Sequence, residues 1–518
     1  MTGGYYSNQL YNDYQKLMEK KETLAAKLAQ QAQQHQADYQ YILRMEAQLT
    51  ENEKTIQALT QQAETLKKEV ERLNQIQGQD STNSGLPTGH TPLHKNKHVP
   101  NSRKKSGKKK GGQAGHKKHT LPKFQEDELT DVAIHDVQQC PNCQEELNQI
   151  ASGRTKDEFD YQVVLIKKRH VFPVYQCPKC QKKTQAPIPP RLKEENQYGP
   201  HVQAMALSLM NEGNVSLQKT QQMIRGLTFE EIHPSEGYLA KLQQRAAKGL
   251  ETFTEDLRRQ LLTQSWVHWD DTVVMVNQQR ACLRFYGDET IALYKAHRRK
   301  NKAGVLDDQI LSLLNEKTTV IHDHNTINYG EEFSYAHAEC NAHLLRDLQK
   351  CSENTGHQWS QDLASLIQTT HQRRKQLIEE GTPAFSETDS FGFFLKLEQA
   401  LVLGEEENKK EEAIYYAAAE KALLKRLMTY RLPYFSWVVN FDFPFTNNVS
   451  ERSLRGVKSK MKVAGQFQNI ATAKHYAAIR SYCESCRRNQ INPVTALEQL
   501  VKGEPWTVAE ILNEETKK

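Results

Sequence analysis

Two aspartates stand where apolar runs with the pattern of β-strands come to an end. Asp270 closes the run WVHWD, and Asp323 closes the run TTVIHD. A buried acid is costly unless it binds a metal ion or pairs with an opposite charge, although acids also end strands because they are solvated there. Two such aspartates and a third acid from a later helix could share two divalent ions about 4 Å apart. This pattern predicts phosphoryl transfer assisted by two metal ions.

The third acid cannot be chosen from the pattern alone. Glu451 lies in TNNVSERSLR, where TNN offers good capping residues and predicts a helix that begins near Asn448, with the acid in its first turn. Glu398 and Glu420 are equally compatible with this reasoning. An ordinary surface helix whose Glu and Arg pair in solution is the alternative. Three cations follow Glu451 and would lie where a phosphate backbone passes: Arg452, Arg455 and Lys458.

A second group of metal-ligand residues lies within residues 123–190. Two C-x-x-C knuckles, each turning on a proline, can place four thiolates tetrahedrally around one Zn²⁺ ion and fold a small segment by themselves. A closed shell of four sulfurs leaves no open position, so this zinc is expected to be structural. Four unrelated free thiols are the alternative. The predicted ligands are Cys140, Cys143, Cys177 and Cys180.

The other cysteine pairs have weaker patterns. The chain has nine cysteines, an odd number that favours reduced thiols over a disulfide framework. Cys340 and His343 are spaced to share a helix face, where they could contact a metal or DNA, or simply pack as a core pair. Cys483 and Cys486 have the same spacing inside a helical run, and two buried thiols are expected there.

The elements that carry the two aspartates form a series of predicted strands and helices. Three strands, a helix, a strand and then alternating elements is the order of the ribonuclease-H-like fold. The aspartates are therefore expected on neighbouring central strands of one sheet. The expected strands are residues 265–276, 281–289, 290–298, 318–325 and 334–340, and the expected helices are residues 305–316 and 342–350.

Residues 191–258 are predicted to form a helical segment that resembles a helix-turn-helix. Three short helices are expected, over residues 199–213, 215–227 and 234–250, with Ser235 as an N-cap. Short helices joined by a Gly-containing turn can bind DNA, but small helical packing units have the same pattern.

Residues 1–78 are predicted to form a coiled coil. Residues 10–77 contain neither Gly nor Pro, and one heptad register runs through them, with Leu17, Leu24, Leu59 and Leu66 among its d positions. At about 1.5 Å per residue this is a rod about 100 Å long that cannot bury its apolar seam alone. A parallel homodimer or a higher oligomer is expected. A lone charged helix folded back on the body is the alternative.

Residues 79–122 are predicted to be a basic, disordered linker. No Asp or Glu occurs from residue 81 to residue 125, and KKKGGQAGHKKHTLP places cations around glycines that would allow close approach to phosphates. A solvated linker is the alternative, and the net charge of +6 for the whole chain does not decide between them. The candidate DNA contacts are Lys104, Lys105, Lys108, Lys109, Lys110, Lys117 and Lys118.

The chain shows no sign of a membrane segment. No apolar run approaches the roughly 20 residues that cross a bilayer, and MTGGYYSNQLYNDYQ lacks the pattern of a secretory signal. A soluble, cytoplasmic protein is expected.

The order of these motifs resembles the bacterial transposases of the insertion-sequence-66 family. The resemblance covers nearly the whole chain and rests on the coiled coil, GGQAGHKKHTL, the paired cysteine knuckles, VHWDDT, IHDHN and TNNVSERSLR. It implies that Asp270, Asp323 and Glu451 form the D-D-E triad, whereas Asp271 is only a neighbouring acid. Trp269, His324 and Asn325 depart from the small residues usual at those positions.

The resemblance implies a multidomain α+β protein with a coiled coil, a zinc ribbon, a helical DNA-binding segment and a ribonuclease-H-like catalytic domain. That domain is expected over residues 259–478, with an all-helical insertion over about 353–440, followed by a helical tail over 479–518.

The resemblance also implies an activity. Two Mg²⁺ or Mn²⁺ ions would support cutting of double-stranded DNA at the ends of a mobile element and joining of the 3′ ends to target DNA. Accessory proteins of the same element are possible partners, and the nucleoid is the expected location. A catalytically silent DNA-binding relative is the alternative.

Overall fold

The computed structural model describes residues 4–77, 123–135, 137–150, 154–161, 163–411 and 414–513. It divides into one unit over residues 1–91 and a second over residues 92–518. The predicted basic linker and its seven lysines lie outside the described residues. Among the described residues, none of the helices combines the length and the apolar character that crossing a bilayer requires.

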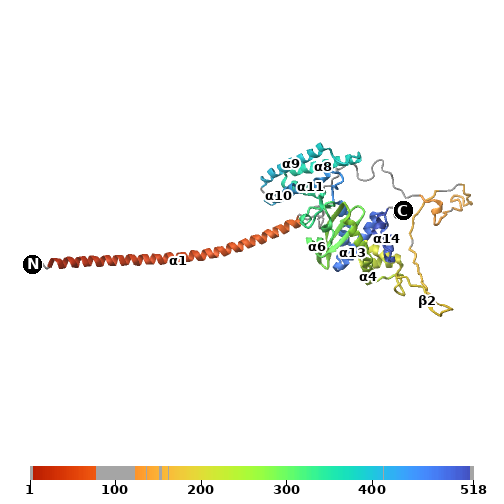
Figure 1. Cartoon of the computed structure of the whole chain (residues 1–518), viewed down its shortest axis with the longest axis horizontal. Helices are drawn as coiled ribbons and strands as arrows, with labels where there is room; N and C mark the ends of the chain where they lie inside the picture. The colour runs from red at the N-terminus through yellow and green to blue at the C-terminus, as the bar shows by residue number, and fades with distance from the viewer. Residues whose placement is uncertain are drawn as a thin grey trace. The chain divides into compact units, whose positions relative to one another are not determined.

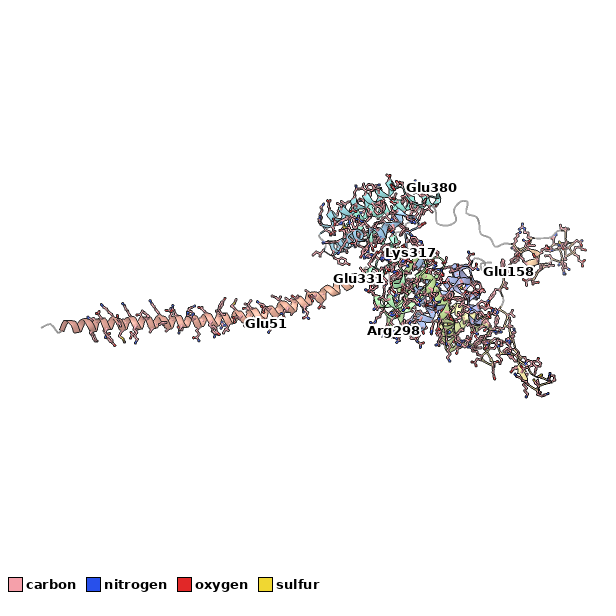
Figure 2. The ribbon with its side chains drawn as sticks, viewed as in Figure 1. Glu51, Glu158, Arg298, Lys317, Glu331 and Glu380 are labelled. Carbon is pink, nitrogen blue, oxygen red and sulfur yellow. The ribbon has the colours of Figure 1, made fainter. Side chains whose placement is uncertain are left out.

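The first unit contains one uninterrupted helix, α1 (Gly4–Gln77), of 74 residues (Figure 1). Its side chains are exposed from residue 11 to residue 66, apolar ones included, and Figure 2 shows them pointing outward along the rod, Glu51 among them. The predicted helix is confirmed. Its pairing with a second copy stays a prediction.

The segment with the cysteine knuckles has little regular structure. It contains a 3₁₀ turn (Glu126–Glu128) and an antiparallel hairpin of β1 (Val174–Gln176) and β2 (Lys183–Gln185). Among the described residues of 157–176, only Val174–Gln176 form a strand. Tyr161, Val164 and Ile166 are exposed, so these side chains form no packed face.

A five-stranded mixed sheet forms the centre of the second unit. The strands are β3 (Trp266–Val276), β4 (Gln279–Gly287), β5 (Ala292–His297), β6 (Thr319–His322) and β7 (Ala336–Glu339), in the spatial order β5-β4-β3-β6-β7. β3, β4 and β5 pair antiparallel, whereas β6 and β7 run parallel to β3. This arrangement fits the predicted ribonuclease-H-like domain.

The predicted helix over residues 305–316 is wrong in its length. The structure has a short α6 (Lys302–Asp307), a 3₁₀ turn (Leu311–Leu313) and a second 3₁₀ turn after β6 (Thr326–Tyr329). Helix α6 ends because buried Asp308 accepts hydrogen bonds from Arg284 and Tyr286, and Gln309 then takes a φ of 52°. A continuous helix would break both features.

Helices cover both faces of the sheet. The upstream helices are α2 (Pro200–Asn211), α3 (Leu217–Leu227), α4 (Glu236–Gly249) and α5 (Glu251–Leu261). The predicted N-cap is confirmed, because the Ser235 side chain accepts from the Tyr238 N–H. The downstream helices are α12 (Asn448–Val463), α13 (Ile470–Arg488), α14 (Pro493–Lys502) and α15 (Val508–Leu512).

These helices and the sheet share their cores. Leu207, Val267 and Leu497 lie in one cluster, so residues 191–258 and 479–518 both pack on the sheet. Phe285 and Leu454 lie in a second cluster, on the opposite face. The boundary expected between residues 478 and 479 falls inside α13, where the apolar face of the helix continues without a break.

The predicted helical insertion has its own core. It contains α8 (Gln358–Glu379), α9 (Glu387–Asn408), α10 (Ile414–Thr429) and α11 (Arg431–Val439). Helix α7 (Asn341–Thr355), which was expected in the catalytic domain ahead of the insertion, packs in the same core. Apolar side chains such as Leu348, Trp359 and Leu427 are fully buried between these helices. Figure 1 shows α8 to α11 as one group of helices.

Candidate active site

Asp270 and Asp323 stand at matching positions on neighbouring strands. The last paired residues of β3 and β6 are His268 and Ile321, and each aspartate lies two residues further along the chain. Asp323 directly follows β6, as predicted, but Asp270 lies inside β3 and not at its end, because the strand continues through its pairing with β4. Successive side chains of an extended chain point to opposite faces of the sheet, so residues two apart point to the same face. Asp270 therefore shares a face with His268, and Asp323 shares one with Ile321. The parallel register therefore brings the two carboxylates together.

The charges of the two acids interact. The pKa of Asp270 lies well above its ordinary value, because burial disfavours its charge and because Asp323 and then Asp271 repel it. Its Oδ1 accepts one hydrogen bond, from the Asp271 N–H at 2.7 Å. These acids are thus costly to hold together without a cation.

Glu451 reaches the same place from α12. It lies in the first turn of that helix, as predicted, and its Oε1 is 3.8 Å from Nδ1 of His343. The same nitrogen is 3.0 Å from Oδ1 of Asp323, so His343 stands between the two acids. Burial lowers the pKa of His343, but its contacts with Asp323 and Cys340 outweigh burial and raise the pKa to about 11. The three acids predicted as a triad therefore converge.

Asn447 fixes the start of α12 against the sheet. Its side chain was expected to cap the helix, but it makes no cap hydrogen bond. Instead, its Oδ1 lies 3.0 Å from Nδ1 of His268, and its Nδ2 donates to the Trp269 carbonyl at 2.9 Å. Both partners immediately precede Asp270 on β3. Its backbone N–H donates to the Cys340 sulfur at 3.2 Å. This buried asparagine therefore sets the distance between Glu451 and the strand that carries Asp270.

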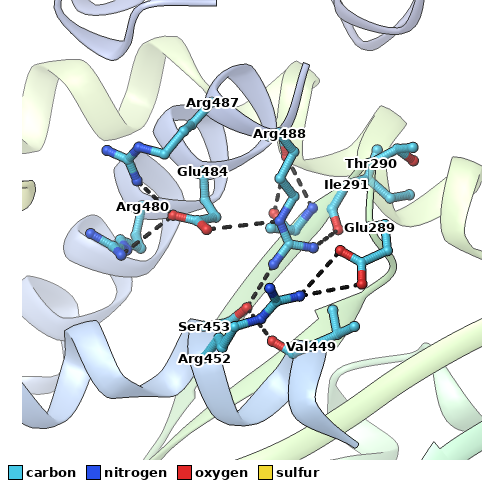
Figure 3. A network of polar contacts seen from close by, with 12 residues as sticks. Glu289, Thr290, Ile291, Val449, Arg452, Ser453, Arg480, Glu484, Arg487 and Arg488 are labelled. Carbon is cyan, nitrogen blue, oxygen red and sulfur yellow. Dashed lines mark hydrogen bonds and ion pairs between the residues drawn. The ribbon is translucent and has the colours of Figure 1, made fainter. Parts of the chain in front are cut away.

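Arginines from α13 hold the next turns of α12 (Figure 3). Arg488 donates to the Ser453 hydroxyl at 2.6 Å. Gly456 faces Arg480, and a Cβ atom at this glycine would lie 2.7 Å from Nη2 of Arg480. A side chain at this position would therefore require the Arg480 guanidinium to shift.

The predicted DNA-contacting cations on α12 take different positions. Arg452 pairs with exposed Glu289 at 3.3 Å (Figure 3). Nη2 of Arg455 lies 4.0 Å from Oε2 of Glu451. Burial lowers the pKa of Lys458, and attraction to the three acids partly opposes that effect. Lys458 is therefore the cation of this set that interacts with all three acids.

Asp271 is held away from the triad. Adjacent residues of a strand point to opposite faces, and Asp271 pairs with Nζ of Lys300 at 2.6 Å. Its other oxygen lies 3.5 Å from the Cys282 sulfur. An acid neutralised in this way has little need of a metal ion.

The two rival third acids lie in the helical insertion and are already satisfied. Glu398 pairs with Arg431 at 3.1 Å, and both side chains are exposed. Glu420 is buried, with Nε1 of Trp359 at 2.6 Å and Nδ2 of Asn408 at 2.8 Å. Within the part of the chain that the structure describes, these partners of both acids belong to the helical insertion.

Two residues at the site were not anticipated from the sequence. Arg346 donates to Oε1 of Glu451 at 3.2 Å, and Lys300 neutralises Asp271. Arg346 follows His343 by three residues on α7, so helical spacing from the C-x-x-H motif could have indicated it. His343 itself was predicted as a possible packing or metal residue, and it lies between two acids.

The cysteines of the predicted zinc ribbon lie on two similar turns. The Gln144 N–H donates to the Cys140 carbonyl, and the Gln181 N–H donates to the Cys177 carbonyl, with φ near 60° at both glutamines. Backbone N–H groups within each turn lower the pKa of the first cysteine. In the part of the chain that the structure describes, no three of these sulfurs lie within 4.8 Å of one another, so the zinc ion stays a prediction. Cys483 and Cys486 are buried, as expected.

One observation at Asp323 indicates that divalent ions fit the acid site. Its Oδ1 is buried without a hydrogen bond, although it lies 3.0 Å from His343, whose Nδ1 also lacks one. A cation would satisfy this oxygen and relieve the repulsion that raises the pKa of Asp270. Carboxylate oxygens are the donors that Mg²⁺ and Mn²⁺ prefer.

Comparison with protein families gives a match for this part of the chain. Residues 195–475, more than half of the chain, match the family model described as the IS66 family of transposases. No curated protein matches the chain. The matched range contains Asp270, Asp323 and Glu451.

Proposed function

Because the chain belongs to the IS66 family of transposases, we propose that it cleaves DNA at the ends of a mobile element and joins the 3′ ends to target DNA. The observation that supports this most directly is the convergence of Asp270, Asp323 and Glu451, with one buried carboxylate oxygen unsatisfied. Three acids from two strands and a distant helix suit metal-dependent chemistry on a phosphodiester.

Asp270, Asp323 and Glu451 would hold two Mg²⁺ or Mn²⁺ ions. When bound, such ions lower the pKa of an attacking water or 3′ hydroxyl and stabilise the charge that develops on the phosphate. The chain's own residues orient the acids. Asn447 fixes the start of α12, and Arg346 and His343 hold Glu451 in the absence of a cation.

Cations near the acids would position the DNA backbone. Lys458 interacts with all three acids, and Arg455 lies beside Glu451 with most of its side chain exposed. Phosphate contacts by such residues fix orientation without reading sequence. Recognition of the element ends would then depend on other segments, namely the helices within residues 191–258, the cysteine knuckles and the basic linker.

The cysteine knuckles would bind one structural Zn²⁺ ion. The matching turns and the lowered pKa of Cys140 and Cys177 support this assignment, because thiolates rather than thiols bind zinc.

Helix α1 would pair with a second copy of the chain. Apolar side chains at its heptad positions, such as Leu17, Leu24 and Leu59, are all exposed, and a coiled coil would bury them. A dimer would bring two DNA ends together, with accessory proteins of the element as further partners.

A cleavage and joining assay tests the proposal. The full-length protein is incubated with a labelled element end, a target plasmid and Mg²⁺, alongside Asp270→Asn, Asp323→Asn and Glu451→Gln, with Asp271→Asn as the matched control. Both products are expected from the wild type and the control, and from none of the three variants. Wild-type activity in a triad variant would reject that residue as a ligand. Cleavage without joining would indicate a nuclease, and DNA binding without cleavage would indicate a silent relative.

A further inference from the structure

Asp323, Cys340 and His343 form a cluster of three different metal-ligand atoms. A carboxylate oxygen, a sulfur and a ring nitrogen lie within 4.8 Å of one another, and this is the one such group among the described residues. The end of β6 supplies the acid, while Cys340 is the N-cap residue of α7 and His343 lies in its first turn. The strand end and the helix start are joined by a hydrogen bond from the Cys340 N–H to the His322 carbonyl.

Two buried polar atoms of this cluster lack a hydrogen bond. Oδ1 of Asp323 and Nδ1 of His343 are both buried without a hydrogen bond, although they lie 3.0 Å apart. The sulfur of Cys340 accepts the Asn447 N–H at 3.2 Å, a contact that supports a thiolate ligand. The buried Cys351 differs, because its thiol is directed at Glu420.

The donor set differs from the one that Mg²⁺ prefers. Mg²⁺ takes oxygen ligands in octahedral geometry, whereas sulfur and imidazole donors select Zn²⁺ and related ions. Three protein ligands also leave a fourth tetrahedral position open. The cluster therefore has the composition of a site for a thiophilic ion, next to acids that suit Mg²⁺.

We propose that Asp323, Cys340 and His343 bind a thiophilic divalent ion such as Zn²⁺, and that this ion competes with Mg²⁺ for Asp323. The binding site stands on the geometry alone, whereas the competition rests on the proposed function. Zn²⁺ bound at this cluster occupies the carboxylate that the proposed reaction needs. It therefore inhibits cleavage at concentrations far below those of Mg²⁺.

Cobalt spectroscopy on the full-length protein tests the site without any need for activity. Co²⁺ is titrated into the wild type, Cys340→Ser, His343→Gln and the control Cys483→Ser, all of which keep the four knuckle cysteines. Subtracting the Cys340→Ser spectrum from the wild-type spectrum is expected to leave a thiolate-to-cobalt charge-transfer band. The Cys483→Ser spectrum is expected to match the wild type. Superimposable wild-type and Cys340→Ser spectra would overturn the proposal.

His343→Gln keeps the thiol and covers the case in which Cys340→Ser fails to fold, as judged by circular dichroism. Loss of one ligand is expected to weaken Co²⁺ binding at this site at least about tenfold, since loss of an outer-shell partner alone costs about 10- to 100-fold. An unchanged titration for His343→Gln would overturn the site.

The competition is tested separately, by Zn²⁺ titration of Mg²⁺-supported cleavage, with each variant normalised to its own rate without Zn²⁺. The midpoint of inhibition is expected to rise at least about tenfold in His343→Gln. A cobalt charge-transfer band together with cleavage that Zn²⁺ does not inhibit would reject the competition but support the binding site. A cobalt band in a preparation that never cleaves DNA would count against the proposed function and leave the site intact.

Discussion

Asp323 at the edge of the sheet keeps a buried oxygen without a hydrogen bond, whereas Glu420 in the helical insertion has donors on both oxygens. Trp359 and His357 donate to one oxygen of Glu420, and Asn408 donates to the other. Burial raises the pKa of Glu420, but these hydrogen bonds outweigh burial and the pKa lies below its ordinary value. The pKa of Asp270 lies above its ordinary value.

The difference separates two uses of a buried acid. An acid whose oxygens are satisfied by protein donors stabilises the packing of the elements around it. A group of acids with too few hydrogen-bond donors raises the free energy of the folded state, and a bound cation lowers it. The burial of an acid does not distinguish a structural acid from a metal-binding one, but the number of hydrogen-bond donors around its oxygens does.

Isosteric substitution of one acid from each region should separate the two uses most strongly. Glu451→Gln removes a predicted metal ligand, so the cleavage rate should fall at least about 10³-fold, which corresponds to about 4 kcal/mol. In Glu420→Gln the new side-chain N–H group lies against the N–H donor of Asn408, so two donors meet without an acceptor. The free energy of unfolding should therefore fall by about 2–3 kcal/mol. Strand cleavage and urea denaturation measure the two quantities. The comparison would fail if Glu420→Gln lost activity while keeping its stability.

Removal of the Asn447 side chain should reduce the cleavage rate less than substitution of Glu451 does. Asn447→Ala loses the contacts with His268 and the Trp269 carbonyl, so Glu451 is less well positioned. Cleavage is expected to fall about 10- to 100-fold. Asn447→Asp, which keeps one acceptor, should lie between the alanine variant and the wild type. Unaltered cleavage by Asn447→Ala would show that α12 is positioned by other contacts.

The two acids should give opposite pH dependences in the absence of divalent ions. The folded pKa of Glu420 is depressed, so its stabilisation is present above about pH 4.3 and is lost as pH falls through the folded value. The folded pKa of Asp270 is raised, so its favourable contribution is present below about pH 3.9 and is lost as pH rises through the folded value.

Relative to the wild type, Asp270→Asn should therefore gain stability with rising pH, and Glu420→Gln should lose it. Thermal denaturation in chelator from pH 3 to pH 8 measures both trends. Mg²⁺ should remove most of the gain for Asp270→Asn. Parallel curves for the two variants would contradict the contrast.

A surface pair should give the smallest effect. Arg452 and Glu289 are mostly exposed at 3.3 Å, so Arg452→Ala should change the free energy of unfolding by less than about 1 kcal/mol. If Arg452 contacts a phosphate, its removal should reduce the salt dependence of DNA binding by about one unit of slope. Glu289→Ala is the matched control, because it breaks the pair without removing a cation. Equal slopes for all three proteins would place Arg452 outside the DNA interface.

Most of the sheet could be predicted from the sequence, because its strands are continuous apolar runs. Two such runs located Asp270 and Asp323, although Asp270 lies inside β3 and not at its end, and the parallel register places each acid two residues beyond the last pair of β3 and β6. Helix α13 could be predicted only in part, since a boundary was expected inside it. Its packing on β5 depends on contacts between residues far apart in the chain.

The third acid could not be chosen from pattern because helical periodicity carries no information about tertiary neighbours. Glu398, Glu420 and Glu451 all lie on helices, and only their partners distinguish them. Resemblance to a family identified Glu451. For the same reason, Arg346 and Asn447 could not be assigned to the site from the sequence, although the TNN motif had drawn attention to Asn447.

Gly456 ties the support of the helix that carries Glu451 to a residue without charge. It lies five residues beyond Glu451 on α12 and meets Arg480, which is nearly buried and paired with Glu212 at 3.2 Å. A Cβ atom at Gly456 would require the Arg480 guanidinium to shift and would disturb its ion pair with Glu212. One added methyl group could thus weaken the contact between α12 and α13 while every acidic residue remained in the sequence.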